Sequence, residues 1–211
     1  MIHPIRRGAL AALLLVCGGC THTAPRPDIS LIKEYLDPQT AMTVRTVAEP
    51  FIYGRDVPEL AVNARDFVSM GAVELDNMGQ HRLFLALVSW STIDRARIGA
   101  KPPALPERLL ITTGAATKEW RVSSHTPRDL GAGEPILEPP AGRLGDSWVE
   151  FKPSEIRALA LNPPDSIDVV VDGAPQRYTL WRRGDAALNE FASNLPVDMA
   201  PARGRRRHVG P

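Results

Sequence analysis

The sequence FVSMGAVEL, residues 67–75, leads through DNMGQ, residues 76–80, into HRLFLALVSWST, residues 81–92. Two apolar runs joined by a short segment with Asn and Gly are typical of a β-hairpin, because Gly accepts the positive φ that such turns require. This stretch therefore predicts two adjacent antiparallel strands and decides the fold class.

The second run has the alternation of a central strand. Successive side chains of a strand point to opposite faces of its sheet. Here both sets are apolar, with Leu83, Leu85 and Leu87 on one face and Phe84, Ala86, Val88 and Trp90 on the other. We therefore expect this strand to be covered on both sides.

Shorter strand signals flank this hairpin, at residues 42–47, 51–53, 109–113, 119–123, 148–151, 167–171 and 176–181. The last two runs are joined by Asp172-Gly173, which predicts a second hairpin. Short helices are expected at 29–36, at 155–161 after Ser154 as N-cap, and after Asp185 as N-cap.

Many short strands separated by turn signals favour a mainly β fold. The predicted architecture is an antiparallel β-sandwich-like domain with two or three short helices. The alternative is an α+β layer with one curved antiparallel sheet. We expect a single domain over residues 35–192 and a disordered basic tail over 193–211.

The charge balance excludes one class of partner. Apart from Arg6, Arg7 and the four arginines of the tail, 19 basic residues stand against 24 acidic ones. The globular part is therefore mildly acidic, whereas a nucleic-acid-binding domain would present a basic face. The tail, residues 203–208, is either a membrane-attracted cluster or an unselected chain end.

The N-terminal residues have the pattern of a targeting signal. Arg6 and Arg7 precede an apolar run over residues 9–16, which gives way to Gly18, Gly19 and Cys20. This run is too short to span a bilayer and has the length of a signal-peptide core. The segment resembles the signal peptide and lipobox of bacterial lipoproteins, although Cys17 stands where Leu is usual. An uncleaved hydrophobic N-terminus is the alternative.

The resemblance implies a processing route and a location. Residues 1–19 would be the signal peptide, cleaved between Gly19 and Cys20, and residues 20–34 a tether lipidated at Cys20. Thr21 follows that cysteine where Asp would signal inner-membrane retention, so the resemblance implies the outer membrane, facing the periplasm. With Cys17 and Cys20 accounted for, the mature domain has no thiol for a disulfide, and its stability must come from its core.

Candidate chemistry is sparse. Gly145-Asp146-Ser147 resembles the opening of the GDS-type esterase motif, for which His125 and Asp129 could complete a triad. The favoured interpretation is a turn that leads into the Trp148 strand. His81 and His125 are isolated, without the spacing of a zinc site. Gly131-Ala132-Gly133 lacks the context of a dinucleotide loop. No catalytic residue, metal or cofactor is therefore predicted.

Four tryptophans, Trp90, Trp120, Trp148 and Trp181, lie in or beside predicted strands, and we expect at most one or two at the surface. The favoured function is a non-catalytic binding or assembly module that contacts envelope proteins or cell-wall polymer through loops 94–107 and 124–145. The alternatives are an envelope serine hydrolase that uses Ser147 and a purely structural lipoprotein. The oligomeric state is not indicated.

Overall fold

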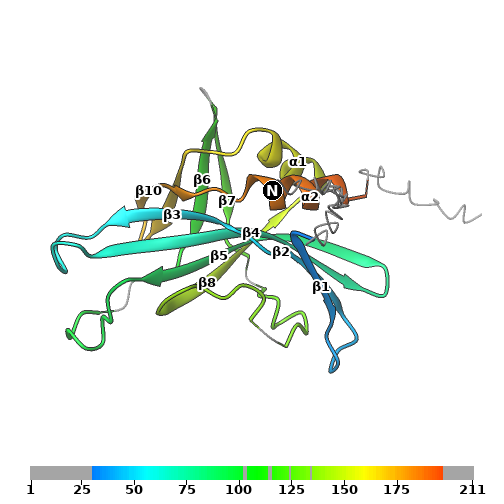
Figure 1. Ribbon diagram of the computed structural model, residues 1–211, viewed down its shortest axis with the longest axis horizontal. Helices are drawn as coiled ribbons and strands as arrows, with labels where there is room; N and C mark the ends of the chain where they lie inside the picture. Colours follow the sequence, from blue (N-terminus) through cyan, green and yellow to red (C-terminus); the bar gives the residue numbers. More distant parts are fainter. Residues whose placement is uncertain (1–29, 102–103, 114–115, 124, 134, 197–211) are drawn as a thin grey trace, which may run out of the picture.

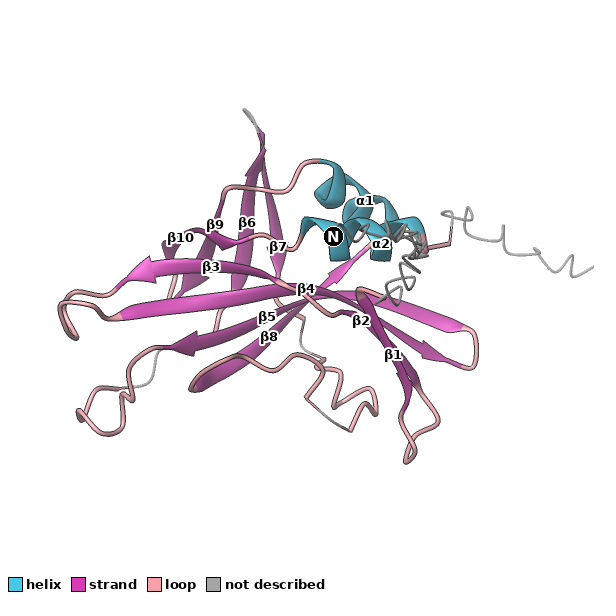
Figure 2. Cartoon of the chain, viewed as in Figure 1, coloured by secondary structure: helices cyan, strands magenta, loops and turns pink. Residues whose placement is uncertain are grey.

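The computed structural model describes residues 30–196, apart from 102–103, 114–115, 124 and 134. The processing site at Gly19 and Cys20, Thr21 and residues 197–211 of the expected basic tail lie outside the described residues, whereas Ser193 ends the last helix and Leu195 is buried in the core. In the described part, ten strands and two short helices form the fold (Figures 1 and 2). The elements are β1 (Ile32–Leu36), β2 (Thr43–Val47), β3 (Phe51–Asp56), β4 (Arg65–Asn77), β5 (Gln80–Ser91), β6 (Arg108–Thr113), β7 (Ala116–Arg121), β8 (Arg143–Phe151), α1 (Pro153–Leu161), β9 (Ser166–Val171), β10 (Ala174–Arg182) and α2 (Asp185–Ser193).

All of these strands belong to one strongly curled antiparallel sheet. Its main path runs β8-β5-β4-β3-β10-β9-β6-β7. The long strand β4 pairs with β3 along its first half and with β2 along its second half, and β1 extends the sheet beyond β2. The mainly antiparallel β fold with short helices is confirmed. The sheet is continuous, as in the alternative architecture, and is not divided into two stacked layers.

Two tight turns carry the predicted hairpins. Met78 and Gly79 join β4 to β5 with φ values of 52° and 86°, and the Gly79 N–H donates to Asp76 Oδ1 at 2.7 Å. Asp172 and Gly173 join β9 to β10 with φ values of 50° and 75°. Positive φ at both central residues matches the right-handed twist of the flanking strands, so both hairpins form where the sequence predicts them.

The concave face of the sheet holds the main core. Side chains of β3, β4, β5, β8, β9 and β10 point inward there, and α1 and α2 cover them on the same side of the sheet (Figure 1). The helices contribute Ile156 and Leu159 from α1 and Leu188 and Phe191 from α2. Burial of this apolar surface is the main stabilising contribution available to a domain without disulfides.

The convex face has its own cover. Phe84, Ala86 and Val88 of β5 pack there with Trp148 of β8 beneath apolar side chains of the β7–β8 loop, namely Leu130, Ala132, Ile136 and Leu137. Towards the other end of β5, Trp90 stacks on Phe67, with 4.2 Å between the ring centroids. Both faces of β5 are therefore buried, as the alternation predicts.

The curl brings the two ends of the main path together. Just after β7, the Ser123 N–H donates to the carbonyl of Trp148 on β8 at 2.6 Å. Trp120 stacks on Phe151 with 4.8 Å between their ring centroids. The sheet is thus a strongly curled half-barrel, and its end strands β7 and β8 approach each other beside α1 through these contacts.

Several local predictions need correction. Residues 32–36, expected to be helical, form edge strand β1, because pairing with β2 outweighs a weak local helix preference. The sheet thereby includes residues 32–34 of the expected tether. Helix α1 begins at Pro153 after Lys152, whose N–H donates to the Glu155 carboxylate at 2.9 Å, so Ser154 is not its N-cap. Gly184, and not Asp185, is the N-cap of α2. None of the described helices is long and apolar enough to span a bilayer.

Candidate functional site

The residues of the alternative Ser147 triad do not converge. Ser147 lies opposite Leu87 in the β5–β8 ladder, and Leu87 belongs to the concave core. Opposed residues share a face. Ser147 is accordingly directed into that core and is only 3% exposed. His125 and Asp129 lie in the loop that crosses the opposite, convex face.

Asp129 instead organises its own loop. Its Oδ2 accepts the backbone N–H of Thr126 at 2.8 Å and the Thr126 hydroxyl at 2.9 Å. These hydrogen bonds lower the pKa of Asp129 below its ordinary value. The neighbouring His125 donates its backbone N–H to Ser123 Oγ at 3.1 Å. Both residues therefore have local structural contacts.

The other sequence candidates have structural partners as well. His81 Nδ1 lies 2.9 Å from Oε1 of the buried Glu74, which also pairs with Arg45. Across the described ranges, no three His, Cys, Asp or Glu side chains gather to hold a metal ion. The Gly133 N–H donates to Oδ2 of buried Asp37 at 2.6 Å, which ties the loop to the β1–β2 turn.

The tryptophans divide as expected between core and surface. Trp90 and Trp148 are buried, Trp120 is half-buried, and Trp181 is 62% exposed. Trp181 packs edge-on against Phe67 and lies beneath the guanidinium of Arg65, 4.5 Å from ring centroid to Arg65 Cζ. The exposed Trp181 ring is therefore already in contact with Phe67 and Arg65.

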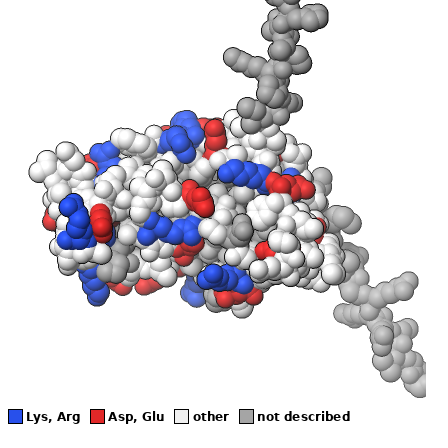
Figure 3. Space-filling view, turned by 60° about the horizontal axis from the view of Figure 1, so that its bottom comes forward, with Lys and Arg blue, Asp and Glu red and all other residues white. Residues whose placement is uncertain are grey.

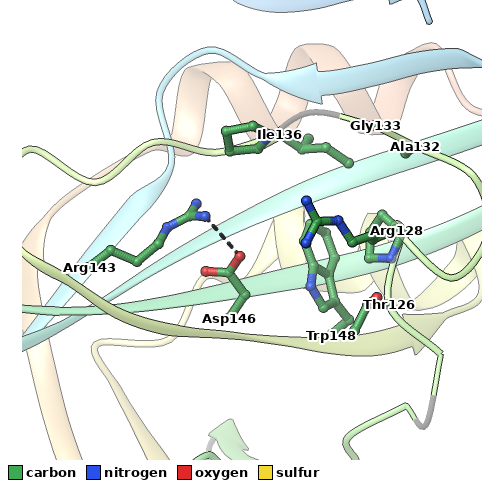
Figure 4. Close-up of a pocket in the computed structure, with 10 residues that line it drawn as sticks. Thr126, Arg128, Ala132, Gly133, Ile136, Arg143, Asp146 and Trp148 are labelled. Atoms are coloured by element: carbon green, nitrogen blue, oxygen red, sulfur yellow. Dashed lines mark ion pairs between the residues drawn. The ribbon is translucent and has the colours of Figure 1, made fainter. Parts of the chain in front are cut away.

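A hollow of about 360 Å³ lies between strand β8 and the loop over the convex face, and we call it the β8 pocket. Asp146 and Trp148 rise into it from β8, between Arg143 and Arg128 (Figure 4). The lining residues are Thr126, Pro127, Arg128, Ala132, Gly133, Pro135, Ile136, Arg143, Asp146 and Trp148. Strand alternation explains why Asp146 and Trp148 share this pocket while Ser147 does not.

Asp146 is the electrostatic centre of the β8 pocket. Its Oδ2 lies 3.1 Å from Arg143 Nη1, and its Oδ1 is buried without a hydrogen-bond partner among the described residues. Burial raises the pKa of Asp146, and the nearby Arg143 only partly opposes this effect. A buried acceptor without a donor is uncommon in native proteins.

The two arginines of the pocket, Arg143 and Arg128, differ in the number of their hydrogen-bond and ion-pair partners. Arg143 pairs with Asp146 and also donates from Nη2 to the carbonyl of Leu137. The guanidinium of Arg128 has no hydrogen bond or ion pair with any described residue. Arg128 is thus available to an anionic group that enters the pocket.

A second hollow of about 530 Å³ adjoins the β8 pocket, and Arg143 lines both. It lies between residues 91–100 and residues 141–144, and we call it the adjoining hollow. Figure 3 shows the side of the molecule on which these loops lie, with basic and acidic groups interspersed and no field of one sign.

The sequence motif points to the β8 pocket, but through Ser147 and not through Asp146. The Gly145-Asp146-Ser147 motif suggests the hydroxyl of Ser147 as the functional group. In the structure it is the carboxylate of Asp146 that faces the pocket. The signal available beforehand was strand alternation extended back from Trp148, which places Asp146 beside the indole. Comparison with protein-family models, with curated proteins and with solved structures found no match to this chain.

Proposed function

We propose that this protein is an envelope lipoprotein, anchored through Cys20, whose domain binds a partner molecule in the β8 pocket without transforming it. The N-terminal resemblance supports the anchor and the outer-membrane location. The pocket supports the binding role, because a concave site with apolar walls and a few convergent polar groups is typical of ligand recognition.

The observation that carries this proposal is the state of Asp146. Its Oδ1 is buried and receives no hydrogen bond from the part of the chain that the structure describes, although burial already disfavours the charged carboxylate. A perturbed ionisable group in a pocket is a recognised indicator of a functional site. A ligand that donates a hydrogen bond to Oδ1 would relieve this cost, so the carboxylate favours binding.

The remaining polar groups favour recognition over chemistry. The Thr126 hydroxyl donates to Asp129, and Ser147 faces the opposite side of β8. Among the described lining residues, Asp146 therefore has no adjacent nucleophile to activate. The proposed role is consequently binding, with an envelope protein or cell-wall polymer as the natural partner of an anchored domain.

Site-specific photo-crosslinking in cells tests this function. A photoreactive residue at Pro135, an exposed lining position, is compared with one at Val62, which is 95% exposed in the β3–β4 turn. We expect a discrete conjugate from position 135 that is absent from position 62 and depleted by Asp146→Leu, which removes the acceptor oxygen. The same crosslinking in a Cys20→Ala chain shows whether formation of the conjugate depends on the lipid anchor. Identical products at the two positions would contradict the proposal and favour a purely structural lipoprotein.

A further inference from the structure

We propose that the ligand of the β8 pocket is a carboxylate-bearing oligosaccharide that extends into the adjoining hollow. In this arrangement its carboxylate pairs with Arg128 and one of its hydroxyls donates to Asp146 Oδ1. This inference rests on the proposed function and specifies the ligand class for the same site.

The charges of the pocket favour an anionic ligand. Arg143 is paired with Asp146, which leaves Arg128 as the uncompensated cation among the described lining residues. In the adjoining hollow, Arg95 Nη2 donates to buried Asp66 at 2.6 Å, so the charge of Arg95 is compensated, although its buried Nε has no partner among the described residues. A guanidinium presents a planar fork of donors that matches a carboxylate. Arg128 is thus the group expected to select the anion.

The unpaired carboxylate oxygen adds a second requirement. An ionised Asp accepts hydrogen bonds and donates none. The ligand must therefore carry a hydroxyl or amide donor within the span of the pocket from its anionic group. A sugar acid combines these groups on one ring, with its carboxylate at one end and hydroxyls around the rest.

The two hollows favour a chain over a single ring. The β8 pocket and the adjoining hollow meet at Arg143 and have volumes of about 360 and 530 Å³. Small side chains line the second hollow, among them Ala96, Ala100 and Ala141. Asp94 and Arg95 also line this hollow beside the small residues, so it holds charges of both signs. Successive sugar units fit the two joined hollows.

The neighbouring backbone argues against a peptide strand. Peptides often bind by adding a strand to an open sheet edge. On β8 the carbonyl of Trp148 already accepts the Ser123 N–H at 2.6 Å, which occupies this part of the edge. The pocket instead lies over the face of β8, where side chains and the apolar walls of Pro127 and Ile136 make the contacts.

Calorimetric titration of the full chain tests the ligand class. The probes are a galacturonic-acid tetramer, a neutral glucose tetramer of similar length, and a tetrapeptide with a free C-terminal carboxylate. We expect the acidic sugar alone to bind, with affinity reduced at least about tenfold by Arg128→Gln or by Asp146→Leu, which removes the acceptor oxygen. Arg182→Gln, which removes an exposed arginine on β10, is the matched control and should leave affinity unchanged.

The outcomes separate this inference from the proposed function. Equal binding of the neutral tetramer, or full affinity in Arg128→Gln, would overturn the acidic-glycan inference. Preferential binding of the tetrapeptide would replace it with peptide recognition at the same site. If position 135 yields its specific conjugate in cells and no sugar binds, the inference fails while the binding function stands. If position 135 also yields nothing specific, both fail.

Discussion

The backbone N–H of Ser123 donates to the carbonyl of Trp148 at 2.6 Å and joins the two ends of the curled sheet. Three residues before Ser123 and three after Trp148, the rings of Trp120 and Phe151 stack. These two contacts show that the segment that ends at Ser123 and strand β8 run in opposite chain directions where they meet. We call this junction the seam. The same bond lies next to the β8 pocket, so the closure of the sheet and the site share one strand.

Loss of the seam bond should destabilise the domain. Ser123→Pro removes the N–H, and we expect it to lower the free energy of unfolding by about 1–3 kcal/mol because the Trp148 carbonyl loses its donor. Ser123→Ala retains the N–H and loses only the hydroxyl contact with His125. Urea unfolding of both variants measures the difference, and equal stability would show that the seam contributes nothing.

Asp146→Asn should stabilise the chain at neutral pH. The folded state raises the pKa of Asp146 above its ordinary value, so the folded chain binds this proton more readily than the unfolded chain. Stability is therefore lost as pH rises through the interval from about 4 to the raised pKa. Asn avoids that loss. Thermal unfolding from pH 3.5 to 7.5 checks this, and a parallel offset at every pH would contradict it.

Asp37 should contribute stability that disappears in acid. Backbone N–H groups of Gly133, Gln39 and Thr40 donate to its carboxylate and lower the pKa of Asp37. A lowered pKa gives stabilisation that is present above the ordinary value and is lost as pH falls through the folded one. Asp37→Ala should lower the free energy of unfolding at pH 7, because these donors lose their acceptor.

The contrast between pH 7 and acid identifies the ionised carboxylate as the cause. Urea unfolding should show the cost of Asp37→Ala shrinking below the lowered pKa, where the wild-type side chain is protonated. A cost that stays constant with pH would assign the effect to packing alone. Protection of the Gly133 amide from hydrogen exchange should fall in the variant at pH 7.

Gly184 should not tolerate a side chain. A Cβ there would lie 2.6 Å from the Glu49 carbonyl oxygen and 2.9 Å from the Phe51 nitrogen, both backbone atoms. Because this close approach seats the start of α2 against the β2–β3 connection, Gly184→Ala should cost about 1–3 kcal/mol. Gly142→Ala is the control, since its nearest contact is 3.8 Å from Ser91 O. Equal thermal midpoints would refute the steric argument.

Local features of the chain were readable because their causes are local. The hairpin turns at Met78-Gly79 and Asp172-Gly173 depend on positive φ within two residues, and the burial of β5 on both faces follows from a period of two. Residues 32–36 were misread because an edge strand owes its form to a partner, β2, and not to its own propensity.

The β8 pocket was only partly readable for a related reason. Strand alternation places Asp146 and Trp148 on one face, but the position of Arg128 depends on a loop held by Asp37, far away in the chain. The spacing of Asp146 and Arg128 in the sequence has no periodic meaning, because a folded loop separates them.

The sequence by itself determined an antiparallel β fold, its two hairpins and an N-terminus with the pattern of a lipoprotein precursor. Only the tertiary structure decided that the sheet curls until Ser123 reaches Trp148, and that Asp146 faces a pocket while Ser147 faces the core. The physical reason is that alternating strands satisfy a stacked and a curled sheet equally well. Twist and pairing between distant strands choose between the two, and no short stretch of residues encodes them.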